Sequence, residues 1–292
     1  MTDGLDLDLH VLLILGVTVA TSFTYISLGA GVQSTAMYVL AVDGVLRDKL
    51  GIDKIDFAVF ADTQDEPAFV YEQLEACKKY GQHKIPVEVV TAGKLSEVAT
   101  TLLVPAFHAG GRNGQGQNMR TCTDRFKLSP INKYVRRRLG AKPGCKVPAD
   151  AHATALIGIS LDEVVRMKPC PHYYQTNRWP LVELGLRRSE CLHIVERAGM
   201  PTPKRSACTF CPFRDHKSWQ ELKELDPGGF RSAVEYDNKI RSAWLTASTK
   251  NDYFVHPSRT PLESVDFSAS PQQSLSEWAE SWDAECEGMC GV

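Results

Sequence analysis

The 292-residue chain has no marked excess of charge, because 33 Lys and Arg residues face 35 Asp and Glu residues and leave a formal net charge of −2. Near-balance argues against a protein whose whole surface binds polyanions. The apolar run at 11–20 is shorter than the roughly 20 residues that span a bilayer. The acidic residues before this run have the wrong sign for a secretory leader. We therefore expect a cytoplasmic protein that does not enter a membrane.

The sequence also lacks a paired set of cysteines, internal repeats and a lysine-bearing phosphate loop. Nine cysteines, an odd number, argue against a disulfide framework in a chain without a secretory signal. No Gly-Lys-Ser or Gly-Lys-Thr closes its glycine-rich turn, which excludes the common NTPase P-loop. The composition, 43% hydrophobic and 23% charged, predicts one substantial core with a smaller module beside it.

The glycine-rich turn follows the first predicted strand. Residues 24–28 are β-branched and aromatic, which predicts a buried strand, and residues 33–42 have the apolar periodicity of a helix. We expect Gly29 and Gly31 to adopt backbone conformations that a Cβ would forbid. Successive N–H groups would then face one concavity at a helix N-terminus, where phosphate binds. The alternative is a strand-to-helix turn whose glycines serve packing only.

The segment Gly29-Ala30-Gly31-Val32-Gln33-Ser34-Thr35 resembles the pyrophosphate loop (PP-loop) of the adenine nucleotide α-hydrolase superfamily, written Ser-Gly-Gly-x-Asp-Ser. The branch it is most similar to is the phosphoadenosine-phosphosulfate (PAPS) reductase family. Gly29 stands where that family usually has serine, and Gln33 where it has aspartate. The resemblance implies an α/β fold with a Rossmann-like parallel sheet and flanking helices, and a bound adenine nucleotide (ATP, APS or PAPS) with Mg²⁺. The loop residues that it implies for nucleotide binding are Ser27, Gly29, Gly31, Gln33, Ser34 and Thr35.

Two later strands end in segments that resemble the same family. Residues 53–61 predict a strand that ends at Asp62-Thr63, where the family contacts adenosine; in open parallel sheets, ligands bind at this edge. The ordinary alternative is a strand-end turn before a helix that starts near Pro67. Residues 86–90 and 153–159 predict two further strands.

The last of these strands leads into a polar run. The resemblance implies that Gly158 lies beside the phosphates, that Asp162 and Glu163 hold Mg²⁺, and that Arg166 meets a phosphate as a catalytic residue. The alternative is a helix start with acids in its first turn. Lys127 belongs to a segment that resembles the family pattern Cys-Cys-x-x-x-Lys-x-x-Pro, in which Thr121 replaces the first cysteine; we expect it at the nucleotide.

Cysteines near this segment predict a metal site. Cys208 and Cys211 form a Cys-x-x-Cys pair, whose spacing lets two thiolates reach one metal. The resemblance implies a [4Fe–4S] cluster that also uses Cys122, and our own inference assigns the fourth position to Cys191. The alternatives are a structural zinc on the same four thiolates, or small buried cysteines without metal.

The chain ends in a segment that contains Cys286 and Cys290. Sulfonucleotide reductases carry a nucleophilic cysteine in a Glu-Cys-Gly context near their C-terminus, and Glu285-Cys286 matches this loosely. Cys286 is therefore a candidate catalytic nucleophile or sulfur carrier. The alternative is a terminus without a role.

These segments divide the chain into an N-terminal extension (1–22), a nucleotide-binding α/β domain (23–185) and a helical C-terminal region with the Cys-x-x-Cys and the cysteine tail (186–292). Basic residues cluster between 120 and 146 with little acid among them. This stretch predicts a nucleic-acid acceptor, tRNA or DNA, or else a solvated helix face.

We expect an enzyme that adenylates a substrate with ATP and then transfers sulfur with an iron–sulfur cluster, a cysteine desulfurase being a candidate sulfur donor. A second hypothesis is an APS or PAPS reductase that uses Cys286 and a thiol reductant. A third is a non-catalytic nucleotide-binding module with structural zinc.

Overall fold

The computed structural model describes residues 22–98, 104–110, 116–117, 120–242 and 251–267. Its centre is a five-stranded parallel sheet of order β3-β2-β1-β6-β7, an α/β architecture consistent with a Rossmann-like fold. The strands are β1 (Ser22–Ser27), β2 (Phe57–Asp62), β3 (Val87–Thr91), β6 (His152–Ile157) and β7 (Gln175–Arg178). The four strands predicted from the sequence are thus confirmed, and β7 is an addition.

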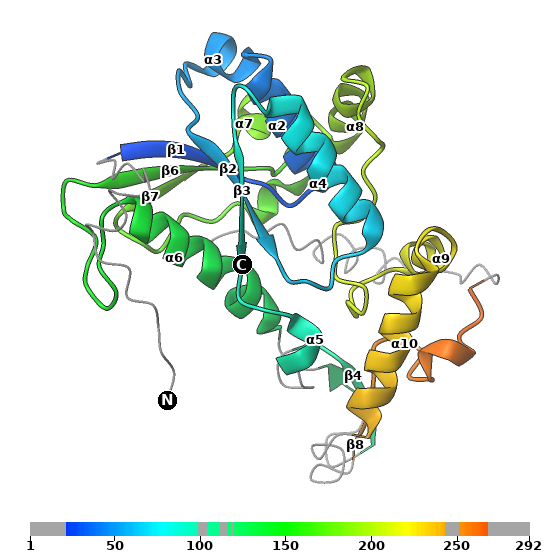
Figure 1. Ribbon diagram of the computed structural model, residues 1–292. Coiled ribbons are helices and arrows are strands. Elements are labelled where there is room, and N and C mark those ends of the chain that lie inside the picture. The colour runs from blue at the N-terminus through cyan, green and yellow to red at the C-terminus, as the bar shows by residue number, and fades with distance from the viewer. Residues whose placement is uncertain (1–21, 99–103, 111–115, 118–119, 243–250, 268–292) are drawn as a thin grey trace.

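Helices cover both faces of this sheet (Figure 1). One face carries α2 (Val32–Val42), α3 (Val45–Leu50), α4 (Ala68–Gly81), α7 (Pro180–Glu183) and α8 (Arg188–Arg197). The other carries α6 (Ser129–Arg138), which continues the π-helical turn η1 (Asp124–Leu128). Both faces are sealed by apolar side chains, because parallel strands are buried on both sides. The register that pairs Ile26 with Ala58 and with Leu156 sets these residues toward the α2 side.

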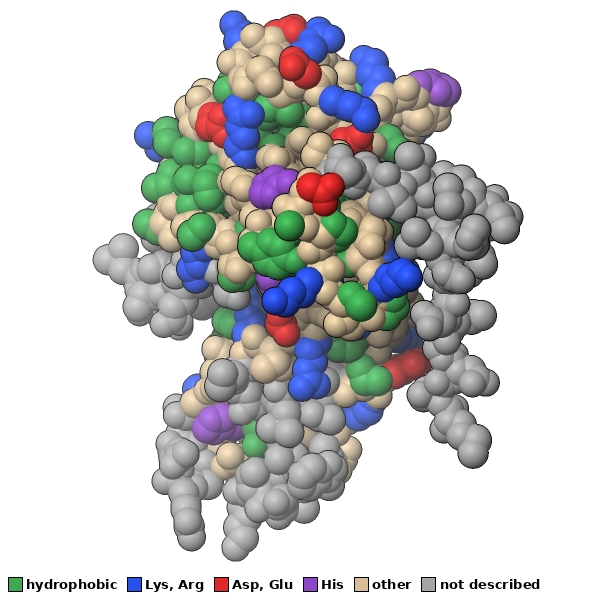
Figure 2. Space-filling view, turned by 90° about the vertical axis from the view of Figure 1, so that its left-hand side faces the viewer, with side chains coloured by type: hydrophobic (Ala, Val, Ile, Leu, Met, Phe, Trp, Pro, Cys, Tyr) green, Lys and Arg blue, Asp and Glu red, His purple; other side chains and the backbone are tan. Residues whose placement is uncertain are grey.

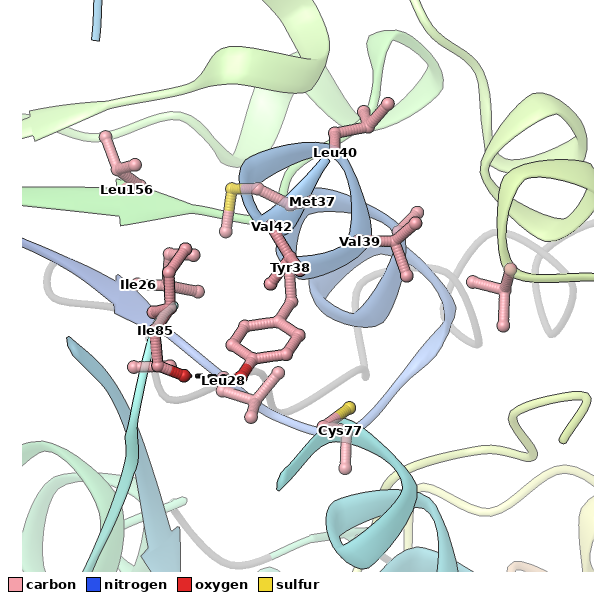
Figure 3. Packing of buried hydrophobic residues seen from close by; sticks show 14 of the residues in the cluster. Ile26, Leu28, Met37, Tyr38, Val39, Leu40, Val42, Cys77, Ile85 and Leu156 are labelled. Carbon is pink, nitrogen blue, oxygen red and sulfur yellow. Dashed lines mark hydrogen bonds between the residues drawn. The ribbon is translucent and has the colours of Figure 1, made fainter. Parts of the chain in front are cut away.

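Helix α2 is buried on nearly all sides, because it packs between the sheet, α4 and α8. Figure 3 shows Tyr38 reaching from α2 so that its hydroxyl donates to the Ile85 carbonyl oxygen at 2.6 Å. Gly81 makes room for this ring: a Cβ there would lie 2.0 Å from the Tyr38 hydroxyl. Cys77 lies in the same cluster, and burial raises the pKa of its thiol to about 12. Cys77 is therefore a core residue and not a reactive one.

Two apolar clusters cover the two faces of the sheet, and a third apolar cluster lies beyond it. Helix α9 (His216–Leu225) and helix α10 (Pro227–Arg241) pack there with a small antiparallel sheet, β5-β4-β8. Its strands come from distant parts of the chain: β4 is Phe107–Gly110, β5 is Gly116–Gln117 and β8 is Asn251–Phe254. Short α5 (Leu95–Val98) and the 3-10 turns η2 (Leu161–Arg166) and η3 (Leu262–Ser264) complete the described elements.

The segments therefore interleave. Helix α8 lies after residue 185, the expected end of the α/β domain, but packs against α2. Strand β4 lies before that residue but pairs with β8, in the part that contains α9 and α10. Helix α10 begins directly after Asp226, whose carboxylate caps it by accepting the Gly229 N–H at 2.8 Å. Over the described ranges, no helix combines the length and the hydropathy that crossing a membrane requires.

The third cluster contains a histidine pair that makes stability depend on pH. Burial, followed by the charge of His216, lowers the pKa of His256 to about 4, and the His256 ring packs edge-on against Phe267. An unfolded histidine has a pKa of about 6.5. The unfolded chain therefore binds the proton first as pH falls below 6.5, and the folded state loses stability down to about pH 4.

We predict that His256→Phe keeps the apolar packing and removes this pH dependence. At pH 5 the histidine costs the folded state about 2 kcal/mol relative to pH 7. Urea unfolding at both pH values should show a smaller difference for the variant than for the wild type, by about that amount. Equal differences would contradict the burial of a neutral His256.

Candidate active site at the carboxyl edge of the parallel sheet

The glycine-rich turn lies between β1 and α2, where the strand order reverses between β1 and β6. Such a switch point is where open α/β sheets bind ligands. One expectation about this turn was wrong: its left-handed residue is Ala30, with φ 55°, and Gly31 is extended. A left-handed residue other than glycine stores strain, and such strain concentrates at functional sites.

Ser34 organises the turn from inside. Its hydroxyl accepts the N–H groups of Gly29 and Gly31, each at 3.2 Å. These two amides therefore bond within the loop and do not face a phosphate. The amides of Val32 and Gln33 belong to the first turn of α2, where N–H groups lack helical acceptors. The Ser206 hydroxyl donates to the Gly29 carbonyl oxygen, so the segment before the Cys-x-x-Cys lies against the loop.

Gln33, which replaces the family aspartate, is fully buried. Its Oε1 accepts from Arg188 Nη1 at 2.6 Å, and its Nε2 donates to Ser160 Oγ at 3.4 Å. The amide can bond a guanidinium and a hydroxyl at once because it has both an acceptor and donors. Gln33 thus joins α2 to α8 and to the turn after β6.

Residue 158 must be glycine because the end of β6 approaches the backbone of the glycine-rich turn closely. A Cβ on Gly158 would lie 2.9 Å from both the Cα and the N of Ser34. The end of β6 therefore abuts the backbone of the phosphate-loop candidate. Ser27 and Thr35 are buried in β1 and α2, where they support the turn from within the fold.

The polar run after β6 is bonded within the protein. The Asp162 carboxylate accepts the Arg188 N–H at the start of α8, at 3.0 and 3.3 Å. Glu163 and Arg166 form a buried ion pair of 2.9 Å. These groups, expected at Mg²⁺ and at a phosphate, act in this structure as a helix cap and as each other's counterion.

The Asp62-Thr63 turn at the end of β2 faces two ways. Asp62 Oδ1 accepts from the Gln64 N–H at 2.7 Å and from the Tyr71 hydroxyl at 2.9 Å. The Thr63 hydroxyl lies 3.2 Å from Cys208 Sγ, toward the cysteines. Gln64 is left-handed, with φ 59°. Strained residues therefore follow both β1 and β2 at this edge of the sheet.

Three predicted metal ligands line one pocket, whereas the fourth does not. Cys122 approaches from the start of η1, and Cys208 and Cys211 approach from the turn before α9. Cys191 lies fully buried on α8, in the apolar cluster that seals α2. The structure does not bring Cys191 to the other three cysteines, because the apolar face of α8 packs against α2. The other walls of the pocket are Thr63, Leu95, Val104, Pro105, Arg120, Thr123, Lys127, Ala207, Phe210, Pro212 and Phe213.

A buried carboxylate, Glu66, supports this pocket. Its Oε1 lies 3.1 Å from Lys127 Nζ, 3.1 Å from the Thr63 hydroxyl and 3.6 Å from Cys208 Sγ. The side chain of Glu66 is 0% exposed and that of Lys127 is 8% exposed. Lys127, expected at the nucleotide, is thus the counterion of Glu66 beside the cysteines.

The environment of Cys208 keeps its thiol protonated. Burial raises the pKa of Cys208 well above the ordinary value, and the Glu66 charge raises it further, while Lys127 opposes both. A bound cation would reverse this balance, since a metal deprotonates the thiols that coordinate it. Thiolates are the ligands that a thiophilic metal or an iron–sulfur cluster prefers, so the three cysteines fit such a group in their chemistry. As they stand, no three His, Cys, Asp or Glu side chains in the described ranges are arranged to hold an ion.

Two arginines that the sequence did not place at this site, Arg214 and Arg120, support the pocket. The buried Arg214 donates to the Cys208 carbonyl oxygen at 3.2 Å and to the Ser218 hydroxyl at 2.7 Å, and it also bonds the Ala207 carbonyl. Burial lowers the pKa of Arg214. Arg120 stacks over Phe213, 4.9 Å from the ring centroid. Arg214 lies three residues after Cys211, and this short spacing is the feature of the sequence that could have indicated its place at the cysteines.

Cys286 lies outside the described residues, as does the rest of the tail after 267. No family model, curated protein or solved structure was found to match the chain.

Because Glu66 and Lys127 form a buried ion pair, we predict that replacing one of them lowers the free energy of unfolding more than replacing both. Lys127→Met leaves a buried carboxylate without its counterion and should cost about 3–5 kcal/mol of unfolding free energy. Lys127→Met combined with Glu66→Gln should recover much of this loss. Urea unfolding measures the cycle.

Lys78→Met is the control, because the exposed Lys78–Glu75 pair should contribute less than about 1 kcal/mol. Additive effects of the two buried substitutions would show that Glu66 and Lys127 do not interact.

Proposed function

We propose that this chain is a PP-loop enzyme of the PAPS reductase type that binds an adenine nucleotide, adenylates a substrate with ATP and then transfers sulfur to it. One observation carries the proposal: the glycine-rich turn and the three-cysteine pocket lie at the same edge of the parallel sheet. Hydrogen bonds from Ser206 to Gly29 and between Thr63 and Cys208 join them. An adenine nucleotide α-hydrolase-like fold is part of this proposal.

The nucleotide side is supported by the turn at the switch point. The α2 N-terminus offers the first-turn amides and the positive end of the helix dipole, which favour a phosphate. Gln33 holds the Arg188 guanidinium at the same helix start, where a cation would stabilise the charge of departing pyrophosphate. In the first step, a substrate oxygen attacks the α-phosphorus of ATP and pyrophosphate leaves. The sulfur then displaces AMP.

The sulfur side is supported by the three thiols in one enclosed pocket. Cys122, Cys208 and Cys211 would hold an iron–sulfur cluster, which when bound supplies sulfur or electrons. Arg120 brings positive charge to the pocket wall, whereas the charge of Lys127 is balanced by Glu66. The apolar residues Leu95, Val104 and Phe210 exclude water, which protects reactive sulfur from hydrolysis and oxidation. A structural zinc on the same thiols is the alternative occupant.

Products distinguish this function from sulfonucleotide reduction. With the right acceptor, the proposed enzyme converts ATP to AMP and pyrophosphate. A reductase would instead release sulfite from APS or PAPS with a thiol reductant, and would lose turnover when Cys286 is replaced by serine. Sulfite release that depends on Cys286 would overturn the proposed function.

Gly158→Ala is predicted to weaken nucleotide binding by displacing the turn. The new methyl group would meet the Ser34 backbone at 2.9 Å, and relieving such an overlap costs about 1–3 kcal/mol. If the binding site bears this cost, calorimetry should show binding of ATP, and of APS if it binds, that is about 5- to 150-fold weaker. Gly228→Ala is the control, because a Cβ there meets only ordinary contacts. Unchanged affinity in Gly158→Ala would remove the turn from the nucleotide site.

The cysteine pocket predicts which residues carry iron. Protein purified without oxygen should be brown, with visible absorption that dithionite bleaches. Cys122→Ser, Cys208→Ser and Cys211→Ser should each reduce bound iron and this absorption. Cys191→Ala should keep both and lose only stability, about 1–3 kcal/mol for truncating a buried side chain.

Iron analysis and absorption spectra of the four variants measure this. Colourless protein with one zinc would favour the structural site, and iron lost only in the Cys191 variant would contradict the assignment.

A further inference from the structure

The amino edge of the sheet and the adjoining helix α6 carry a basic surface that the proposed chemistry does not use. It comprises α6, the loop at 139–151 and the loop at 167–174. In these segments Asp150 is the only acid, against seven cations, although the chain as a whole carries a slight negative charge. Figure 2 looks onto this side, where blue Lys and Arg side chains lie among tan and green surface. The cations are Lys133, Arg136, Arg137, Arg138, Lys142, Lys146 and Lys168.

Most of these cations point to solvent. Lys133 and Arg137 are exposed and lie one helical turn apart on α6, so they share one face, about 5–6 Å apart at Cβ. Lys142, Lys146 and Lys168 are exposed in the two loops. Arg138 is committed elsewhere, since its guanidinium lies 4.9 Å from the Phe57 ring centroid. Glu88 is the acid that faces α6 from β3, where its charge acts on Tyr134.

An aromatic ring stands among these cations. Tyr173 is 61% exposed, yet it is held in place: its hydroxyl donates to the Val147 carbonyl oxygen at 2.6 Å, and its ring packs edge-on against Tyr174 at 5.4 Å. Arg136 lies over Tyr174 at 5.8 Å. The Asn132 amide lies 3.2 Å from the His172 ring nitrogen. The two loops and α6 therefore form one connected surface that presents a fixed aromatic face.

We propose that this surface, Lys133, Arg137, Lys142, Lys146 and Tyr173, binds a single-stranded nucleic acid. Exposed cations with few acids match the phosphate backbone, and an exposed, oriented tyrosine gives an unpaired base a stacking platform. Bases inside a duplex cannot stack on it, which favours a single strand. The inference deepens the proposed function, on which it rests, by naming the class of acceptor. Helix α6 and η1 connect this surface to Cys122 over roughly 20 Å, a span that several nucleotides bridge.

Fluorescence anisotropy with labelled single-stranded DNA and RNA of mixed sequence tests this on the full chain. Affinity should fall as salt rises, and Lys133→Ala with Arg137→Ala should reduce the slope of log K against log salt by about 1.4, or about 0.7 per phosphate contact. Tyr173→Ala should weaken binding about 5- to 150-fold, whereas Tyr173→Phe, which keeps the ring, should bind nearly as the wild type does. Lys49→Ala with Lys79→Ala, exposed cations on α3 and α4, should change nothing.

The proposal is overturned if the wild type does not bind the oligonucleotides, or if the Lys49/Lys79 double variant loses as much affinity as the Lys133/Arg137 double variant. It is also overturned if duplexes bind as tightly as single strands and their binding is unaffected by Tyr173→Ala. Competition by polyglutamate as effective as by oligonucleotide would point to general anion binding and would also overturn it. ATP binding is measured on the same samples. If the wild-type chain binds ATP but no oligonucleotide, only this inference is overturned. If it binds the oligonucleotide but no ATP, only the nucleotide part of the proposed function is overturned.

Discussion

The architecture of the site depends on one buried carboxylate. Glu66 is removed from water, and a buried charge costs several kcal/mol unless its hydrogen bonds are supplied. Three donors supply them at one oxygen: Lys127 from η1, Thr63 from the end of β2 and Cys208 from the turn before α9. The second oxygen, Oε2, is buried and has no hydrogen-bond partner in the part of the chain that the structure describes. Three segments far apart in the sequence thus meet around a single charge.

Two further contacts extend this arrangement to the glycine-rich turn. The Thr209 N–H donates to the Asp65 carbonyl oxygen at 2.8 Å, and the Ser206 hydroxyl bonds Gly29. The Cys-x-x-Cys turn therefore lies between the ends of β1 and β2. Under the proposed function, a nucleotide at the turn and a sulfur centre at the cysteines would share this edge of the sheet. Backbone strain at Ala30 and Gln64 lies at the same edge of the sheet.

The basic stretch divides between the two edges of the molecule. Lys127 balances Glu66, Arg120 stacks on Phe213 and Arg138 packs on Phe57. Those cations belong to the interior and to the cysteine pocket. Lys133, Arg137, Lys142 and Lys146 remain at the surface around Tyr173. One basic stretch of the sequence therefore supplies a buried counterion, cations that pack on aromatic rings, and cations that are exposed to solvent. Which of these each residue becomes depends on its position in the fold.

The sequence alone determined four of the five strands of the parallel sheet and the helices that follow the first two, because β-branched residues and helical periodicity are local properties. It also predicted the glycine-rich turn and the pairing of Cys208 with Cys211, since both depend on short spacings. Only the tertiary structure decided which distant groups meet: Cys191 faces the core, Lys127 reaches Glu66, and Asp162, Glu163 and Arg166 bond within the protein. Helix orientation and strand order set those contacts. A side chain's partner depends on the packing of segments far apart in the chain, which residue spacing does not encode.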